Sequence, residues 1–449
     1  MREASEPMKK IQAILKDERG VAVVVAMVAL LALTALVVAF LAVSAFEPQI
    51  SGNLAAGAQA RYLAEAGIEA AFDGLASTAD WNTALVGATC ATGVAAPTTT
   101  ANSVLPGLTA ASGTFTVTVR NDCFVGSASV SADNVLTGVA LEGSATNDTN
   151  NRVVVTSTGR VTDPNNATVA TRIVKTVIKK TILPPINGAL TFPGLQADVD
   201  FSGSSFTIRG IDTNMDGSNG PGSPVYGIAV GVAANEPGVD TELANNQQNS
   251  VTGKSQTNPA TTTSGDGTVA FDTGLTSAAV TDFVNSIKAN ADISINSPAS
   301  NPFSIQNVGS SCATNVNSST CWGTTSHPKI VYVRGDGTGQ YNALDISGNS
   351  SGTGILIVEN ANLDITGNFN WNGPVIVTGN NVKIRYHGGG NQSIYGTVVV
   401  NELNNDGSTN LEADISGNAS IFYSSQANNL VMNGLGGRKL MSVYSWQEQ

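Results

Sequence analysis

The stretch KDERGVAVVVAMVALLALTALVVAFLAVSAFEPQISGN, residues 16–53, places a short charged leader directly before 26 uncharged and mostly aliphatic residues, 21–46. A helix rises about 1.5 Å per residue, so this run reaches roughly 39 Å and exceeds the roughly 30 Å hydrocarbon core of a bilayer. The apolar core of a secretory signal peptide is shorter, about 7–15 residues, although AVSA at residues 42–45 imitates a cleavage site. The cations that precede the run predict a cytoplasmic N-terminus; they are Lys9, Lys10, Lys16 and Arg19. The sequence therefore predicts a membrane-spanning helix.

Helical character continues beyond this span. The segment NLAAGAQARYLAEAGIEAAFDGLAS, residues 53–77, is rich in the helix-forming residues Ala, Leu and Glu. Its spacing predicts an apolar face that carries Leu54, Ala58, Tyr62, Ala66 and Ile68. The two segments together predict one long helix of some 50 residues, weakened near Pro48 and Gly52.

Length and composition restrict the class of protein. The chain has 449 residues, enough for two or three domains. Charged residues make up 12%, against about 25% in an average soluble protein. This composition is typical of exported, β-rich structure with many turns. The net charge of −12 provides no basic surface, so we expect no nucleic-acid partner.

Four cysteines form two local pairs, Cys90 with Cys123 and Cys312 with Cys321. An even number of cysteines in an exported chain indicates two disulfides, and no CxxC spacing suggests a metal site. The alternative is free buried thiols in a cytosolic protein.

Three segments after the helix have the alternation of strands, namely residues 113–123, 151–161 and 167–183. Val153, Val155, Ile173 and Val177 can face a helix while the intervening basic residues face water. This pattern predicts an antiparallel sheet packed on the long helix. We call the sheet and its connecting loops the head, and we expect it to span residues 76–183 and to end at Pro184-Pro185.

The remaining residues are expected to form two further units. Residues 184–327 are rich in loops, with one amphipathic helix at 276–293 whose apolar side carries Val280, Phe283, Val284 and Ile287. In residues 328–449, short apolar strands alternate with Gly-Asn turns, and Asp-Ile-Ser/Thr-Gly-Asn recurs from Asp345, Asp364 and Asp414. Such self-similar strands predict stacked rungs of a parallel β-helix, or solenoid, with a β-sandwich as the alternative. The predicted fold class is α+β.

One loop has the spacing of a calcium site. In DTNMDG, Asp212, Asn214 and Asp216 alternate and Gly217 permits a tight turn. The bidentate Glu of an EF-hand loop is missing, so calcium would need carboxylates from residues such as Glu236, Asp240 or Glu242. The alternative is an Asx-turn that needs no ion.

The sequence gives no pattern of a catalytic site. The solenoid carboxylates lie mostly at repeat turns, and the two histidines, His327 and His387, lack a readable Ser or Cys nucleophile. We therefore expect no enzyme. Aromatic residues of the C-terminal half could form a surface stripe, but rung packing explains them better; they are Trp322, Tyr332, Tyr341, Trp371, Tyr386 and Tyr395. The loop closed by Cys312 and Cys321 is a candidate contact site.

The N-terminal region resembles the type IV pilin superfamily, and specifically the PilX-like minor pilins. The matching residues are ERG at 18–20, LALT at 31–34, Glu47, Gly52-Asn53 and AEAGIEAA at 64–71. The resemblance implies a leader of residues 1–20, cleaved after Gly20 by a prepilin peptidase that methylates the new N-terminus at Val21. It further implies that the helix of residues 21–75, including Glu47 and Pro48, waits in the inner membrane and is then extracted into a fibre.

One position departs from that family. Major pilins carry Glu at the fifth residue after the cut, where this chain has Val25. A carboxylate inside a bilayer costs several kcal/mol unless it is paired, and in pilins it is thought to pair with the amino terminus of the preceding subunit. A subunit without a predecessor has no use for it, so the departure suggests a position at or near the fibre tip.

These observations lead to three hypotheses. The first is a minor pilin that initiates or caps a type IV pilus and displays a large exported domain for surface or cell contact. Its implied partners are other minor and major pilins, the prepilin peptidase and the inner-membrane assembly platform. The second is a type II secretion pseudopilin, and the third, of another class, is an exported carbohydrate-binding or carbohydrate-active β-helix on a simple membrane anchor.

Overall fold

The computed structural model describes residues 18–78, 80–90, 92–96, 113–123, 142–163, 165, 167–244, 246–254, 269–404 and 410–448. Most of the predicted leader, residues 1–17, lies outside these ranges, and residues 18–20 already belong to the first helix.

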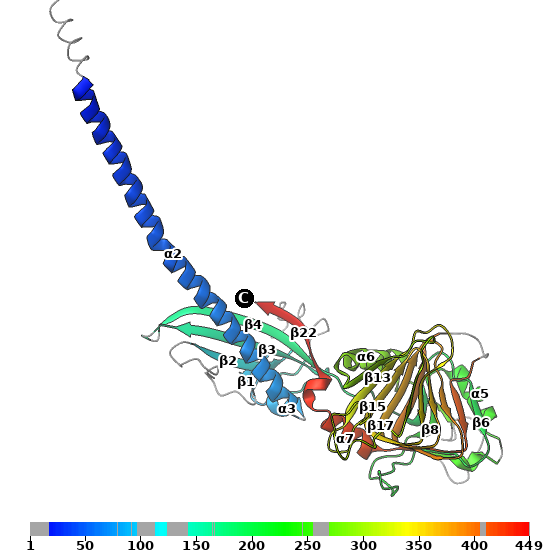
Figure 1. Ribbon diagram of the computed structural model, residues 1–449. Helices are drawn as coiled ribbons and strands as arrows, with labels where there is room; N and C mark the ends of the chain where they lie inside the picture. Colours follow the sequence, from blue (N-terminus) through cyan, green and yellow to red (C-terminus); the bar gives the residue numbers. More distant parts are fainter. Residues whose placement is uncertain are drawn as a thin grey trace, which may run out of the picture.

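Helix α2, Glu18–Ala76, is a rod of 59 residues that remains helical through Pro48 and Gly52. Its N-terminal half stands clear of the other elements, whereas its C-terminal half lies on a β-sheet (Figure 1). The buried residues recur at intervals of three and four, which places them on one face; they are Ala60, Leu63, Ala64, Ile68, Ala71 and Leu75. This face matches the predicted one only in part: Ile68 is buried as expected, but Leu54 and Tyr62 are 70% and 66% exposed.

The head consists of this half of α2, the short helix α3 (Trp81–Ala84) and a sheet of order β1-β2-β3-β4-β22. All neighbouring strands in it are antiparallel. The strands are β1 Val94–Ala95, β2 Thr114–Asn121, β3 Arg152–Thr162, β4 Thr168–Lys180 and β22 Met441–Glu448. The three predicted strands are thus confirmed, together with the predicted packing of the sheet on the helix.

The register of β4 is shifted from the prediction. β3 presents Val153 and Val155 to α2 as expected, but β4 presents Val174 and Ile178 rather than the two residues that precede them. One of those, Val177, is buried on the opposite face. Because β4 carries apolar residues on both faces, its alternation alone could not determine which set faces the helix.

The last strand corrects the predicted domain boundaries. Residues 328–449 were expected to form one solenoid, yet β22 returns to the head and pairs with β4. The N–H of Thr181, just after β4, donates to the carbonyl of Leu440, just before β22, at 2.6 Å. Everything between these residues is therefore an insertion between two neighbouring strands of the head sheet.

The insertion is a parallel β-solenoid with three faces, as its repeats predicted, and the parallel pairing excludes a β-sandwich. The first face has the order β10-β8-β5-β19-β17-β15-β13-β11, and the second β12-β14-β16-β18-β20-β6. The third consists of the first halves of β15, β17 and β19 with β21, β7 and β9. The strands are β5 Gly188–Phe192, β6 Val199–Ser202, β7 Thr207–Arg209, β8 Tyr226–Val230, β9 Val251–Thr252, β10 Val269–Phe271, β11 Ile293–Asn296, β12 Phe303–Gln306, β13 Lys329–Arg334, β14 Asn342–Ser347, β15 Asn349–Glu359, β16 Asn362–Ile365, β17 Asn368–Gly379, β18 Ile384–Tyr386, β19 Asn391–Glu402, β20 Ala413–Ser416 and β21 Asn418–Tyr423.

The solenoid therefore begins near residue 188, not at 328, and most of the predicted loop-rich unit belongs to it. The chain enters mid-stack at β5 and winds outward to β10 at one end. Helix α6, Ser277–Ile287, then crosses the outer side of the first face to the other end, where β11 begins. From β11 the chain winds back until β19 pairs with β5. The two ends of the insertion consequently lie side by side.

Short helices cover the outside of the first face. Helix α6 buries Val280, Phe283, Val284 and Ile287 there, which confirms the predicted amphipathic helix. Helix α7, Ser425–Gly434, contacts β15, β17 and β19. The remaining helical segments are α5 Glu236–Glu242, η1 Ala233–Asn235, η2 Gln248–Ser250, η3 Lys288–Asn290 and η4 Gly437–Leu440.

The repeated Gly-Asn phrase forms one corner of the solenoid. Gly348, Gly367 and Gly417 have φ of +70°, +71° and +71°, a region that glycine adopts without steric cost. The asparagine that follows each bonds to its neighbour in the next rung: Asn368 Nδ2 donates to Asn349 Oδ1 at 2.8 Å. The repeat is thus explained by turn geometry and a ladder of side-chain amides.

The aromatic residues mostly fill the core, as expected. Trp322, Trp371 and Tyr386 are fully buried, and the rings of Phe369 and Trp371 stack with their centroids 6.2 Å apart. Tyr332 is 8% exposed and lies on the outer side of the first face, beneath α6.

Candidate functional site

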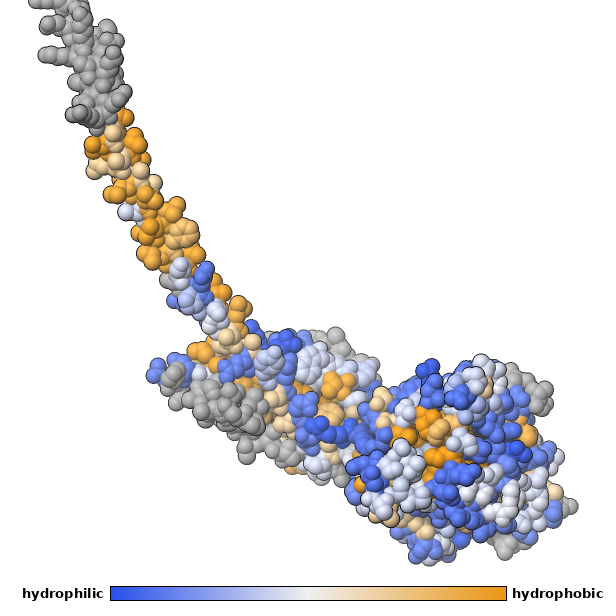
Figure 2. Space-filling view, in the orientation of Figure 1, coloured by the Kyte–Doolittle hydropathy of each residue, from blue (hydrophilic) through white to orange (hydrophobic). Residues whose placement is uncertain are grey.

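The N-terminal half of α2 is an unpacked apolar surface. Its large apolar side chains are more than half exposed; Val21, Val25, Leu31, Phe40 and Phe46 are 56–67% exposed. Its most apolar window has a mean hydropathy of 3.0, and none of that window is buried. By length and composition this helix can cross a membrane. Figure 2 shows this surface as a largely hydrophobic stretch that gives way to a hydrophilic patch shortly before α2 reaches the head.

The polar side chain of Thr34, within the apolar half, is satisfied inside the helix, as a lipid environment requires. The hydroxyl of Thr34 donates to the carbonyls of Leu30 and Leu31, at 2.9 Å each. Glu47 is the first carboxylate after Val21, and at Val25 the chain presents only an exposed aliphatic side chain. The cleavage and methylation predicted at Gly20 and Val21 remain predictions.

Ion pairs fix the rod at both ends of its contact with the head. Near the bare half, Arg61 Nε lies 2.8 Å from Glu65 and 3.5 Å from Glu448 of β22. At the other end, Arg438 of η4 pairs with Asp73 and with Glu69. These surface pairs contribute little energy individually, but they connect the last segment of the chain to α2.

The solenoid joins the head where α2 ends. A Cβ atom at Gly437 would lie 2.2 Å from the carbonyl oxygen of Ala76, the last residue of α2, so these backbones are in direct contact. Figure 1 shows the solenoid beyond this end of the rod, opposite the bare half. Lys439 Nζ also lies 2.5 Å from Asp292, beside the strand β11.

The residues of the predicted calcium loop are engaged by protein groups. The carboxylate of Asp212, which is 1% exposed, accepts from the backbone of Gly222 at 2.6 Å and of Ser425 at 2.8 Å. The carboxylate of Asp216 accepts from the N–H and hydroxyl of Ser218 at 2.9 and 2.6 Å, and these bonds lower its pKa. The amide of Asn214 donates to Ser218 and Asn219.

These bonds are those of a turn and a helix cap. The proposed additional ligands Glu236, Asp240 and Glu242 lie on α5. Within the described residues, no group of three or more His, Cys, Asp and Glu side chains is arranged to hold a metal. Calcium binding stays a prediction.

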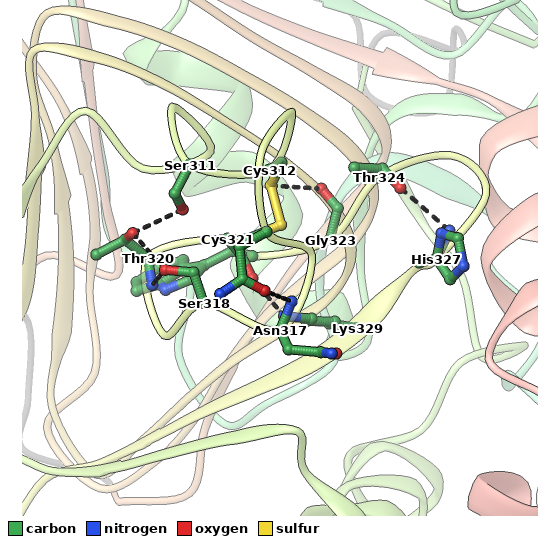
Figure 3. The surroundings of a disulfide bond; sticks show 12 residues. Ser311, Cys312, Asn317, Ser318, Thr320, Cys321, Gly323, Thr324, His327 and Lys329 are labelled. Carbon is green, nitrogen blue, oxygen red and sulfur yellow. Dashed lines mark hydrogen bonds between the residues drawn. A yellow bond between two sulfur atoms is a disulfide. The ribbon is translucent and has the colours of Figure 1, made fainter.

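Both predicted disulfides are present. Cys90–Cys123 links the segment after α3 to the end of β2, and Cys312–Cys321 closes the loop between β12 and β13. Figure 3 shows hydroxyl contacts across the second loop, where Ser311 and Thr320 oxygens are 2.7 Å apart. Lys329 Nζ donates to the carbonyl of the fully buried Cys321 at 2.7 Å. Since the next residue, Trp322, enters the core, this disulfide anchors a cap over the solenoid end.

The solenoid histidines contact neighbouring polar side chains. His387 Nε2 lies 2.7 Å from Asp364 on the second face, and Arg385 Nε lies 2.9 Å from Asp414. The other histidine, His327, contacts the Ser326 hydroxyl at 3.0 Å through Nδ1. The solenoid carboxylates were expected mostly at repeat turns. Glu402 does accept from the N–H of Val382 at 2.8 Å, but Asp345, Asp364 and Asp414 of the repeated phrase lie within β14, β16 and β20.

A group of head carboxylates was not predicted from the sequence. Asp122, Glu142 and Asp148 approach one another beside the Cys90–Cys123 disulfide, and burial raises the pKa of both aspartates to about 6. Asn150 Nδ2 donates to Asp122 at 3.1 Å, and Asn121 Nδ2 donates to Glu142 at 2.8 Å. Only the fold brings these residues together, because Asp122 and Glu142 are 20 positions apart in the chain.

Comparisons with known proteins give little additional information. No protein-family model and no curated protein sequence matches the chain. Among solved structures, a search finds the crystal structure of the competence-associated pilin ComZ from Thermus thermophilus, with 12% identity and a TM-score of 0.21 over 88% of this chain and 97% of that one. A superposition this weak carries no argument, so the functional interpretation depends on the geometry of the chain itself.

Proposed function

We propose that this chain is a pilin-like subunit, stored in a membrane by the bare half of α2 and then packed through that half among the helices of neighbouring subunits. The observation that carries the proposal is one uninterrupted helix, half of it buried on an antiparallel sheet and half of it exposed and apolar. A simple anchor needs no rigid connection to its exported domain. A subunit whose stem must be placed relative to its head does need one.

The position of the solenoid supports a place at the fibre tip. The insertion lies beyond the C-terminal end of α2, where a subunit stacked ahead along the rod direction would meet it. The absence of a carboxylate at Val25 fits the same position, since such a group would need a preceding subunit as its partner. The proposal is therefore a minor pilin that initiates or caps a type IV pilus and presents the solenoid outward.

Intact-mass measurement of the membrane-extracted protein tests the proposal most directly. The expected result is loss of residues 1–20 and a methyl group on Val21. An uncut chain, or a chain cut after Ala45, would instead support an exported domain on a simple anchor or a cleaved signal.

Rigidity of the rod provides a second test. A flexible Gly-Ser-Gly insertion after Ile50 should leave membrane anchoring intact and abolish incorporation into fibres, because the stem is no longer oriented by the head. The matched control is the same insertion after Gly389, an exposed solenoid position where an added Cβ would meet no atom within 4 Å. Equal incorporation of the two proteins would contradict the assembly role of the continuous helix.

The inferred tip position has its own test. Restoring a carboxylate by Val25→Glu should disturb initiation or move the protein away from the tip. Unchanged initiation and tip location would show that Val25 does not determine the position.

A further inference from the structure

A groove of about 810 Å³ lies at the solenoid end next to the head. One wall is formed by the end of α6 and by η3, and the floor by the outer side of β11, β13 and the end of β15. Its polar lining residues include Asn285, Lys288, Asn296, Tyr332, Arg334 and Glu359. Pockets that hold small ligands have volumes of about 300–1,000 Å³, so the groove can accommodate one or two sugar units.

The carboxylate in the groove is already neutralised. Both oxygens of Glu359 contact Lys288 Nζ, at 2.9 and 3.2 Å, and the hydroxyl of Tyr332 donates to the same group. Burial, reinforced by Glu359, raises the pKa of Tyr332, so its hydroxyl remains a donor. These contacts connect η3 to the sheet, and they compensate the negative charge of Glu359.

Arg334, the arginine beside these three residues, is available to bind a ligand. In the parallel register, Arg334 lies directly between Glu359 of β15 and Asn296 of β11, yet the Glu359 carboxylate is turned to Lys288 and Tyr332. The Arg334 side chain is exposed and has no hydrogen-bond or ion-pair partner within the described part of the chain. The other two solenoid arginines are engaged, Arg209 with Asn219 and Arg385 with Asp414.

The geometry points to a binding site for a carboxylated sugar unit in this groove, with the Arg334 guanidinium holding the sugar carboxylate and the neighbouring amides holding its hydroxyls. Lys288, Arg334 and Glu359 sum to one positive charge in a protein whose net charge is −12. A guanidinium matches a carboxylate with two parallel N–H···O bonds. Asn285 and Asn296 supply both donors and acceptors for vicinal hydroxyls.

The neighbouring amides favour a sugar acid over inorganic phosphate. Phosphate could contact the same guanidinium, but it has no vicinal hydroxyls for Asn285 and Asn296 to hold. One free cation in a groove is also too little for a nucleic-acid backbone, which needs a row of phosphate contacts.

The test is isothermal titration of the full-length protein in detergent micelles with trimers of galacturonate and of mannuronate. Their methyl esters, which keep the hydroxyls and lose the charge, and inorganic phosphate serve as comparison ligands. The variants are Arg334→Ala, Arg334→Lys and, as a matched loss of one cation on another face, Lys383→Ala. Thermal melting of each variant separates loss of binding from loss of folding.

We expect at least one uronate trimer to bind, with its ester about tenfold or more weaker, because a charge-assisted pair contributes on that scale. Arg334→Ala should weaken binding by a similar factor and Arg334→Lys by less, while Lys383→Ala binds like the parent protein. Failure of both trimers to bind, equal effects of Arg334→Ala and Lys383→Ala, or phosphate binding as tight as that of the trimers would overturn the assignment.

The inference rests on the proposed function only in that the solenoid is exported. Removal of the leader and entry into fibres should be unchanged in Arg334→Ala. A failure of binding with normal processing therefore concerns the groove alone, and a failure of processing concerns the pilin role alone.

Discussion

Leu190 of β5 pairs with Val398 of β19, so the first strand of the solenoid lies directly against its last long rung, although 207 residues separate the two in the chain. Because the solenoid starts and finishes at the same place in its stack, it can be inserted between two adjacent strands of another sheet without distorting either.

This closure predicts that the head survives removal of the insertion. Replacing residues 183–438 with Asn-Gly should join β4 to β22 in a hairpin, since the Thr181 N–H already bonds to Leu440 at 2.6 Å. Circular dichroism and thermal melting of the shortened chain should show a cooperative fold. A control chain that ends at residue 182 lacks β22 and should melt lower; equal melting of the two chains would contradict the assignment of β22 to the head.

Helix α2 and strand β3 approach each other so closely at Gly159 that a larger residue there should destabilise the head. A Cβ atom at Gly159 would lie 2.0 Å from the carbonyl oxygen of Ala60 and 2.6 Å from the N atom of Ala64. Gly159→Ala should destabilise the head by about 2 kcal/mol or more, because the helix backbone must move away. Gly143→Ala, where nothing lies within 4 Å, is the control and should have little effect. Denaturant unfolding followed by Trp fluorescence measures both; a Gly159→Ala curve that overlays the parent curve would show that the contact is not tight.

Substitution of Asp212, whose carboxylate is buried, can distinguish a calcium site from a turn that needs no ion. Asp212→Ala removes the acceptor for the Ser425 N–H at the start of α7 and leaves that donor unsatisfied. We expect a loss of about 1–3 kcal/mol that is equal in millimolar calcium and in EDTA. A loss seen only with calcium, or a melting temperature of the parent protein that rises with calcium, would favour the ion.

The head should become less stable as the pH rises from about 4 to 7. Burial raises the folded-state pKa of Asp122 and Asp148 to about 6, so between their unfolded and folded values the native state binds more protons and is favoured. This contribution is complete below the unfolded pKa and is lost as the pH rises through 6. Asp122→Asn should remove about 1–2 kcal/mol of the difference. Melting of both proteins across this range checks it; parallel pH profiles would contradict the shift of Asp122.

Much of the architecture follows from local sequence pattern. The apolar run at 21–46, the alternation of β2 and β3, and the Gly-Asn phrases each encode one element through helix length, strand period or turn geometry. The repeat at Asp345, Asp364 and Asp414 indicated parallel rungs because identical turns must stack. Disulfide pairing was readable because each pair is close in sequence.

Other features depend on long-range pairing and leave no local signal. Nothing in MSVYSWQE at 441–448 distinguishes a head strand from one more rung, since both need the same alternation. The rungs β5 to β10 lack the Gly-Asn phrase, so the sequence predicted mainly loops for this part of the chain. Arg334 was not singled out, because its lack of a partner depends on where Glu359 turns. Ile173 and Val177 were expected to face the helix in place of Val174 and Ile178, because β4 is apolar on both faces.

The double connection between solenoid and head has a mechanical consequence. A pull between the solenoid and α2 is transmitted through two covalent strands, β4 and β22, which leave the head at the same point. Tension therefore drags this hairpin lengthwise past β3, loading the eleven register positions of that pair together instead of opening them one at a time. A domain attached through two strands in this way should withstand a pulling force that would detach a domain joined by a single terminal linker.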